Sequence, residues 1–193
     1  MPSAMIHLLT AHTLWPDAPD PFWLGSLAPD AMRERAEKDA MHLRGAADRP
    51  LALKALRDRL DVGDPFARAC LLHLFADLRW DAGMIDPFRQ SWAGPGDWYP
   101  AYRAEAHRAS YGLFHGESWS GQVWAAIQRW DGQSLPPAAH VLSISAEVLA
   151  DYRETVLRKH RQSPPDSASP RFPRPLLLRF AQDTAEAFAD WVG

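Results

Sequence analysis

The segment Pro65–Asp81, PFARACLLHLFADLRWD, constrains the fold of this chain more than any other stretch. Asp64 directly precedes this segment. The pair Asp64-Pro65 is typical of a helix start, because aspartate is a favoured N-cap and proline fits the first turn. Nearly every residue in the range Ala69–Leu78 is apolar. We therefore expect a helix that is buried on most of its sides.

Ionisable residues interrupt this apolar run at helical spacing. His73, Asp77 and Asp81 follow one another at intervals of four residues, so they lie along one face of the helix. A buried ionisable group is costly unless it is paired or binds a metal ion. The His-x-x-x-Asp pattern inside a buried helix therefore predicts a metal site.

The composition favours one reduced, globular domain. The chain has 193 residues, of which 47% are hydrophobic, which is enough for a substantial core. The net charge of −3 and the dispersed cations argue against a stable nucleic-acid partner. Its one cysteine, Cys70, lies in the buried helix, so we expect no disulfide framework and a cytoplasmic location. The N-terminal sequence MPSAMIHLLTAH predicts neither a signal peptide nor a transmembrane segment.

The rest of the chain shows helical periodicity and no alternating strand pattern, which predicts an all-α fold. We expect further helices at Ala4–Thr13, Ala31–Leu43, Pro50–Leu60, Pro100–Phe114, Ser118–Trp130, Ser145–Arg161 and Leu176–Trp191. The proline- and glycine-containing segments between them are predicted to be loops. The resulting hypothesis is one compact multi-helix domain, 1–193, around a buried metal-binding helix. It comprises a metal-site core (1–131), a helix (143–162), a proline-rich linker (163–175) and a C-terminal docking helix (176–192).

Three residues before the central helix are also candidates for the site. His7 interrupts an apolar helix, Asp30 lies where a loop meets a charged helix, and His42 follows the segment KDAM. Each has a structural alternative: a histidine bonded to a backbone carbonyl, a helix N-cap, and a helix C-terminal histidine favoured by the dipole. Their joint occurrence with His73 and Asp77 instead favours a mixed imidazole and carboxylate site. Such ligands suit zinc, or manganese or iron.

The order of these motifs resembles the zinc-dependent phospholipase C superfamily, which includes the fungal single-strand-specific nucleases. The motifs are LGSLAPDA, KDAMH and LLHLFADLRWD, and they are especially similar to a small bacterial branch with the pattern LGxxAPDA, KDxxH and LLHLFxDxxWD. The similarity covers roughly residues 1–124. Members of this superfamily are helical and bind clustered zinc ions that activate water to cleave phosphate esters. The resemblance implies that Asp30, His42, His73 and Asp77 hold one metal ion, and that Asp77 bridges to a second ion bound by His7.

Two departures from the superfamily pattern favour one or two metal ions over three. The larger phospholipases use a processed N-terminal residue as a ligand, whereas this chain opens MPSAMIH. Their additional zinc ligands do not match the spacing of Asp81, His107, His115 and Glu117. Asp81 is therefore either a ligand or a partner to a ligating histidine. His115 is either a substitute ligand or an exposed residue at a helix end.

These observations predict a metal-dependent hydrolase that cleaves phosphate esters of small substrates with metal-activated water. Asp30 is the candidate catalytic residue, both as a ligand and as the carboxylate that receives the proton from water. Arg44 is a candidate for a bidentate contact with the substrate phosphate, with a solvated helix-end arginine as the alternative. The sequence predicts no oligomeric state.

Two alternative functions remain open. A histidine-aspartate-type metal phosphohydrolase is also helical, but that family requires an adjacent His-Asp pair, which this chain lacks. The other alternative is a non-catalytic helical domain for metal binding or protein interaction, whose polar core residues satisfy one another.

Overall fold

Helices form all of the regular secondary structure in the computed structural model of this protein, which describes residues 2–193. The all-α prediction is therefore confirmed. The α-helices are α1 (Ala4–Leu14), α2 (Asp20–Gly25), α3 (Arg35–Met41), α4 (Arg49–Arg57), α5 (Pro65–Trp80), α6 (Asp86–Gln90), α7 (Trp98–Gly116), α8 (Ser120–Gln128), α9 (Pro137–Val141), α10 (Ala146–Arg161) and α11 (Arg174–Val192). A 3-10 helix, η1 (Ala28–Ala31), and a π-helical turn, η2 (Asp81–Ile85), lie between them.

The helix predicted at the centre of the fold, α5, begins as its sequence indicates. The Asp64 side chain accepts hydrogen bonds from the backbone N–H groups of Phe66 and Ala67, at 2.7 and 3.2 Å. Pro65 has no N–H group that would need a partner at this end. These contacts fix the first turn of α5, and they thereby fix the register that carries His73 and Asp77 into the interior.

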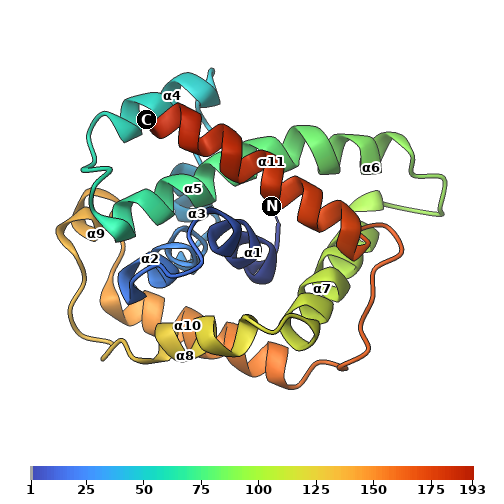
Figure 1. Cartoon of the computed structure of the whole chain (residues 1–193). Helices are drawn as coiled ribbons and strands as arrows, with labels where there is room; N and C mark the ends of the chain where they lie inside the picture. The colour runs from blue at the N-terminus through green and yellow to red at the C-terminus, as the bar shows by residue number, and fades with distance from the viewer. Residues whose placement is uncertain (1) are drawn as a thin grey trace.

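The two terminal helices pack against each other and against α5. Figure 1 shows α1 in the middle of the molecule with α11 crossing over it, and both helices contact α5. Helix α11 buries its Leu177, Phe180 and Phe188 side chains, as a docking helix requires. Helix α1 also contacts α7, so the first helix of the chain is surrounded by later elements. His7, which lies on α1, is therefore shielded from solvent.

A close approach between α2 and α5 requires a glycine. A Cβ atom at Gly25 would lie 2.5 Å from the carbonyl oxygen of Phe66 and 3.0 Å from the Cβ atom of Ala69. The absence of a side chain lets the two backbones meet. The next residue, Ser26, consequently presents its carbonyl oxygen to the buried face of α5.

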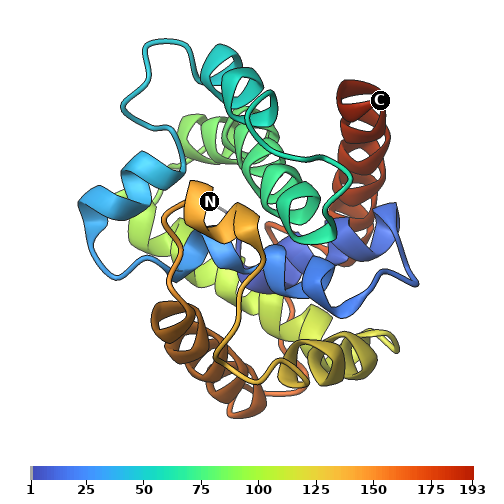
Figure 2. The ribbon, with the colours of Figure 1, turned by 90° about the vertical axis from the view of Figure 1, so that its left-hand side faces the viewer.

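Helix α3 ends in a way that turns a histidine inward. Its last residue is Met41, His42 is the C-cap, and Leu43 has a φ of 56°, the left-handed conformation common just after a helix end. In the view of Figure 2, α3 (light blue) lies at the edge of the molecule opposite α11 (red). His42 nevertheless exposes only 1% of its surface. The helix end therefore carries this imidazole from the periphery into the core.

Three segments that we predicted to be loops contain short helices, and this part of the prediction is wrong. Helices α2, α6 and α9 each carry a proline in the first turn. There the missing N–H group has no cost, so the proline opens the helix instead of breaking it. The structural alternative for Asp30 is also wrong. It lies within η1, and the N-cap of α3 is Glu34, which forms a capping box with Glu37.

The predicted linker is irregular but packed. Residues 163–173 form no helix, and α11 begins at Arg174, slightly before the predicted linker end. Phe172 is 3% exposed and its ring centroid lies 5.3 Å from that of Trp80. The linker therefore joins a single hydrophobic core that runs from α1 to α11. Among residues 2–193, none of the helices has both the length and the apolarity that crossing a membrane requires.

Candidate metal centre

Five buried ionisable side chains meet beside α5. His7 comes from α1, Asp30 from η1, His42 from the end of α3, and His73 and Asp77 from α5. None of them is more than 6% exposed. We call these five residues the His/Asp cluster. The structure thus brings together all five residues that the sequence singled out. Metal binding by these residues stays a prediction.

Two overlapping groups within the His/Asp cluster have the spacing that a metal ion needs. One group is His7, Asp30 and His73, and the other is His42, His73 and Asp77. In each group the possible ligand atoms lie within 4.8 Å of one another. Imidazole nitrogens with carboxylate oxygens are the ligand set of many zinc sites and of similar first-row divalent ions. The cluster can therefore hold a metal ion.

His42 and His73 are oriented by backbone carbonyls. The Nδ1 atom of His42 lies 2.7 Å from the carbonyl oxygen of Lys38, and Nδ1 of His73 lies 2.9 Å from that of Ser26. A carbonyl only accepts hydrogen bonds, so Nδ1 of each ring carries the proton. The Nε2 atom of each neutral ring then presents a lone pair to the cluster. This is the arrangement in which metal-binding histidines are usually held.

The carboxylate of Asp77 faces different histidines with its two oxygens. Oδ2 lies 3.1 Å from Nε2 of His42 and 3.9 Å from Nε2 of His73, while Oδ1 lies 3.6 Å from Nε2 of His7. Neither oxygen has a hydrogen-bond partner. The two oxygens of Asp77 therefore face both groups of possible metal ligands.

His7 is not the structural histidine that the sequence left open. Its ring stacks on that of His73, with centroids 3.5 Å apart and an interplanar angle of 6°. Neither nitrogen of His7 has a hydrogen-bond partner, although the residue is 2% exposed. A buried imidazole without a partner is unfavourable unless something else binds it. His7 therefore behaves as a histidine whose partner is a ligand.

Burial controls the protonation of these groups. It lowers the pKa of His73 to about 4 and holds the pKa of His7 well below its ordinary value, so both rings are neutral at neutral pH. Burial raises the pKa of Asp77 to about 7. For Asp30, burial opposes ionisation, but contact with His42 and the neighbouring imidazoles outweigh it and lower the pKa. The pKa of His42 is raised, because its two carboxylate neighbours outweigh burial.

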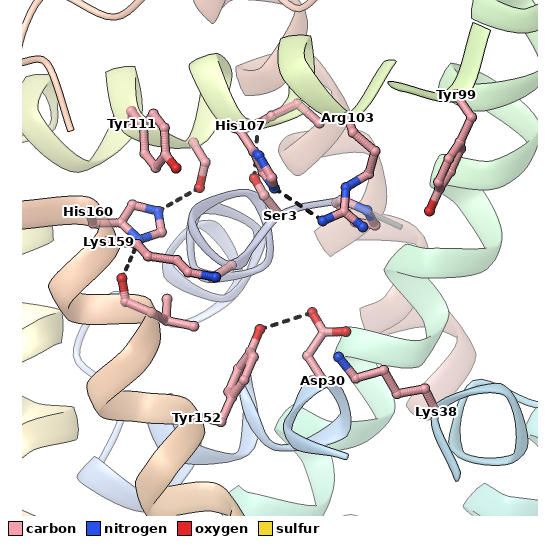
Figure 3. Close-up of a pocket in the computed structure, with 15 residues that line it drawn as sticks. Ser3, Asp30, Lys38, Tyr99, Arg103, His107, Tyr111, Tyr152, Lys159 and His160 are labelled. Carbon is pink, nitrogen blue, oxygen red and sulfur yellow. Dashed lines mark hydrogen bonds between the residues drawn. The ribbon is translucent and has the colours of Figure 1, made fainter. Parts of the chain in front are cut away.

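Asp30 connects the His/Asp cluster to a cavity. Its Oδ1 atom lies 3.4 Å from Nε2 of His42, and its Oδ2 atom accepts a hydrogen bond from the Tyr152 hydroxyl at 3.4 Å. Both Asp30 and Tyr152 line a cavity of about 230 Å³, which Figure 3 shows in close-up. Asp30 is the residue of the cluster that lines this cavity, so a small molecule in the cavity would meet the cluster at this carboxylate.

The remaining predicted residues make other contacts. Asp81 pairs with Arg49 at 2.7 Å, and Arg44 pairs with Asp39 at 2.8 Å. The Nε2 atom of His115 lies 3.1 Å from the carbonyl oxygen of Ser163. None of the three belongs to a metal-compatible group among residues 2–193. Their proposed roles as ligands or as a phosphate contact therefore gain no support from the geometry.

The sequence did not reveal the residues that line the cavity next to Asp30. They include Tyr152 and the cations Lys38, Arg103 and Lys159. Each lies on a helix with an ordinary amphipathic pattern, so nothing in its immediate sequence distinguishes it from a surface residue. The available signal was only that Tyr152 lies on the inward face of its predicted helix.

No protein-family model, curated protein or solved structure matches this chain. The resemblance to the zinc-dependent phospholipase C superfamily therefore stays a prediction from its motifs.

Proposed function

We propose that this protein is a divalent-metal-dependent hydrolase of phosphate esters, with zinc as the preferred ion and manganese or iron as alternatives. The observation that carries the proposal is the pair of Nε2 atoms on His42 and His73, which lie 3.4 Å apart. Both rings donate through Nδ1 to backbone carbonyls, so two lone pairs face each other and Asp77. A cation between them removes this repulsion.

The ligands would be the residues of the His/Asp cluster, binding one or two ions. A divalent ion in such a site lowers the pKa of a bound water molecule and polarises a phosphoryl oxygen. Asp30 is suited to orient that water as a hydrogen-bond acceptor, because its carboxylate is ionised and is the part of the cluster that lines the cavity. Its lowered pKa makes it a weak base, so it is poorly suited to receive the proton itself. Tyr152 holds the second oxygen of Asp30 and so orients the first one toward His42.

The unsatisfied groups argue against the non-catalytic alternative in which the polar core residues pair with one another. Both oxygens of Asp77 and both nitrogens of His7 lack hydrogen-bond partners in the described structure. Native proteins leave few buried polar groups unpaired. A cluster with several such groups beside a cavity fits a ligand-binding centre better than a self-contained polar core.

The direct test is a panel of small phosphomonoesters and phosphodiesters, assayed with the zinc-loaded and the manganese-loaded protein. We expect hydrolysis that is abolished by a chelator and restored by the metal. Asp30→Asn and His42→Ala should lower the rate at least about a hundredfold, since each removes a ligand and Asp30 also orients the water. His140→Ala, an exposed histidine on α9, is the matched control and should keep wild-type activity. Metal binding without hydrolysis of any ester would contradict the proposal.

A further inference from the structure

The cavity beside Asp30 is rimmed by cations from three helices. Lys38 lies on α3, Arg103 on α7 and Lys159 on α10, and all three line the cavity. Figure 3 shows them around the same opening, with Asp30 on the side of Lys38. We call Lys38, Arg103 and Lys159 the cationic rim.

The cationic rim differs from many other cationic side chains of the molecule because its members do not pair with carboxylates in the described residues. Many arginines elsewhere pair with carboxylates, as Arg33 does with Glu147, Arg108 with Glu105, Arg129 with Asp20 and Arg174 with Glu117. Within residues 2–193, no rim residue forms an ion pair with a carboxylate. Arg103 contacts Nε2 of His107 at 3.4 Å, and the Lys38 ammonium lies 5.9 Å from the centroid of the Tyr152 ring. The rim therefore keeps its charge available for a ligand.

The lining of the cavity is strongly unbalanced in charge. Among the lining residues that the structure describes, the one carboxylate is that of Asp30, which is already engaged by His42 and Tyr152. Against it stand the three cations of the rim. Low-dielectric walls concentrate such a field, so the cavity attracts anions. Its volume of about 230 Å³ limits the ligand to a small molecule.

We propose that the cationic rim makes this protein selective for small phosphate monoesters over phosphate diesters. The inference rests on the proposed hydrolase function and adds its substrate class. A monoester phosphate carries close to two negative charges near neutral pH, whereas a diester carries one. It also offers more terminal oxygens for charge-assisted hydrogen bonds from Arg103 and the two lysines. A diester has a second substituent that must occupy the same small cavity.

Lys38 links the rim directly to the His/Asp cluster. Its backbone carbonyl accepts the hydrogen bond from His42, and its side chain lies beside Tyr152, which binds Asp30. A phosphate held by the rim would consequently lie next to Asp30. Arg103 and Lys159 are the better residues to mutate, because both are exposed and lie on α7 and α10, helices that carry no residue of the His/Asp cluster.

The test measures phosphate binding and ester selectivity in the full-length, zinc-loaded protein. Titration calorimetry with inorganic phosphate reports binding, and p-nitrophenyl phosphate and methyl p-nitrophenyl phosphate report KM for a monoester and a diester. Arg103→Gln and Lys159→Gln should each raise the phosphate Kd and the monoester KM about tenfold, the usual effect of losing one charge-assisted contact. The diester KM should change less than about threefold. Arg158→Gln, which removes a neighbouring charge outside the cavity, should change neither value.

The proposal would be overturned if Arg158→Gln and Lys159→Gln raised the phosphate Kd equally. It would also be overturned if the rim variants raised the monoester KM and the diester KM by the same factor. The same titration in metal-free protein separates it from the metal centre. If zinc does not bind, the hydrolase proposal fails. Phosphate binding that still depends on Arg103 would then support the anion-binding rim, and phosphate binding that is independent of Arg103 would refute it.

Discussion

The Nε2 atoms of His42 and His73 lie 3.4 Å apart in the interior, and both rings are held from behind by backbone carbonyls. Because Nδ1 carries the proton in each neutral ring, neither Nε2 atom can donate to the other. The pair therefore needs a cation, either a proton or a metal ion, to be stable. A metal ion bound at this pair would therefore stabilise the folded protein.

Replacing Asp77 by asparagine should have opposite effects with and without metal. At pH 8 the carboxylate is ionised, above its pKa of about 7, and is buried without a hydrogen bond. In the metal-free protein, Asp77→Asn removes this charge and supplies a donor for His42. We therefore expect the free energy of unfolding to rise by about 1–3 kcal/mol. With saturating zinc, the wild type should become the more stable of the two.

Urea unfolding at pH 8, with and without zinc, measures both effects. Asp183→Asn on the exposed face of α11 is the control and should change little in either condition. If metal-free Asp77→Asn were less stable than the metal-free wild type, the buried Asp77 carboxylate would not be destabilising, which would contradict this prediction.

The metal-free protein should lose stability as the pH falls from about 6.5 to 4. Burial lowers the pKa of His160 to about 4, so this ring stays neutral in the fold while the unfolded chain takes up a proton near pH 6.5. The unfolded state then binds more protons, and stability falls with pH. His7 and His73 act in the same sense, whereas Asp77, with its raised pKa, acts in the opposite one.

His160→Gln isolates one of these contributions. Between pH 6.5 and 4.5, the free energy of unfolding of the wild type should fall more steeply than that of the variant, by about 1 kcal/mol per pH unit. The exposed His140→Gln should keep the wild-type slope. Identical slopes for wild type and His160→Gln would show that His160 is not kept neutral by the fold.

Gly25→Ala should weaken both the fold and the metal site. The new Cβ atom would lie 2.5 Å from the Phe66 carbonyl oxygen, so α2 must move away from α5. We expect a loss of about 1–3 kcal/mol in the free energy of unfolding. The movement also displaces the Ser26 carbonyl that orients His73, so zinc affinity should fall.

The control for this variant is Gly121→Ala on α8, where nothing lies within 4 Å of the new Cβ atom. It should keep or slightly raise stability, because alanine favours a helix more than glycine does. Thermal unfolding and a zinc titration compare the two variants. Wild-type zinc affinity in a folded Gly25→Ala protein would contradict the orienting role of Ser26.

Tyr152→Phe should reduce turnover without removing the metal. The hydroxyl donates to Oδ2 of Asp30, and burial keeps the pKa of Tyr152 well above its ordinary value, so it stays a donor across the neutral range. Its loss frees Asp30 to rotate, and kcat should fall about tenfold with KM little changed. Metal analysis accompanies the kinetics. Wild-type kcat, or loss of metal from the variant, would exclude this positioning role.

The sequence predicted the long helices well, because their apolar periodicity and their caps are local signals. Asp64 and Pro65 mark the start of α5 directly. The short helices were missed for an equally local reason. Pro21, Pro87 and Pro137 look like helix breakers in a sequence, but each occupies the first turn of a short helix, where proline is tolerated.

The sequence also singled out the five residues of the His/Asp cluster. His7, His73 and Asp77 stand out as ionisable groups in apolar helices, whereas Asp30 and His42 were singled out by their occurrence together with these three residues. It did not predict how Asp30 is held. Tyr152 lies 122 residues away from Asp30 along the chain, and only the packing of α10 against η1 brings them together. The cationic rim was hidden for the same reason, because Lys38, Arg103 and Lys159 meet only in the folded protein.

Metal content is the measurement that tests the central claim most directly. Protein purified without added metal or chelator should contain about one or two equivalents of zinc, manganese or iron. Inductively coupled plasma mass spectrometry measures this content. His73→Ala and Asp77→Ala should each lose this metal, while His140→Ala should retain it. A wild-type protein that contains no such metal and takes up none on addition would contradict the claim, as would wild-type metal content in both cluster variants.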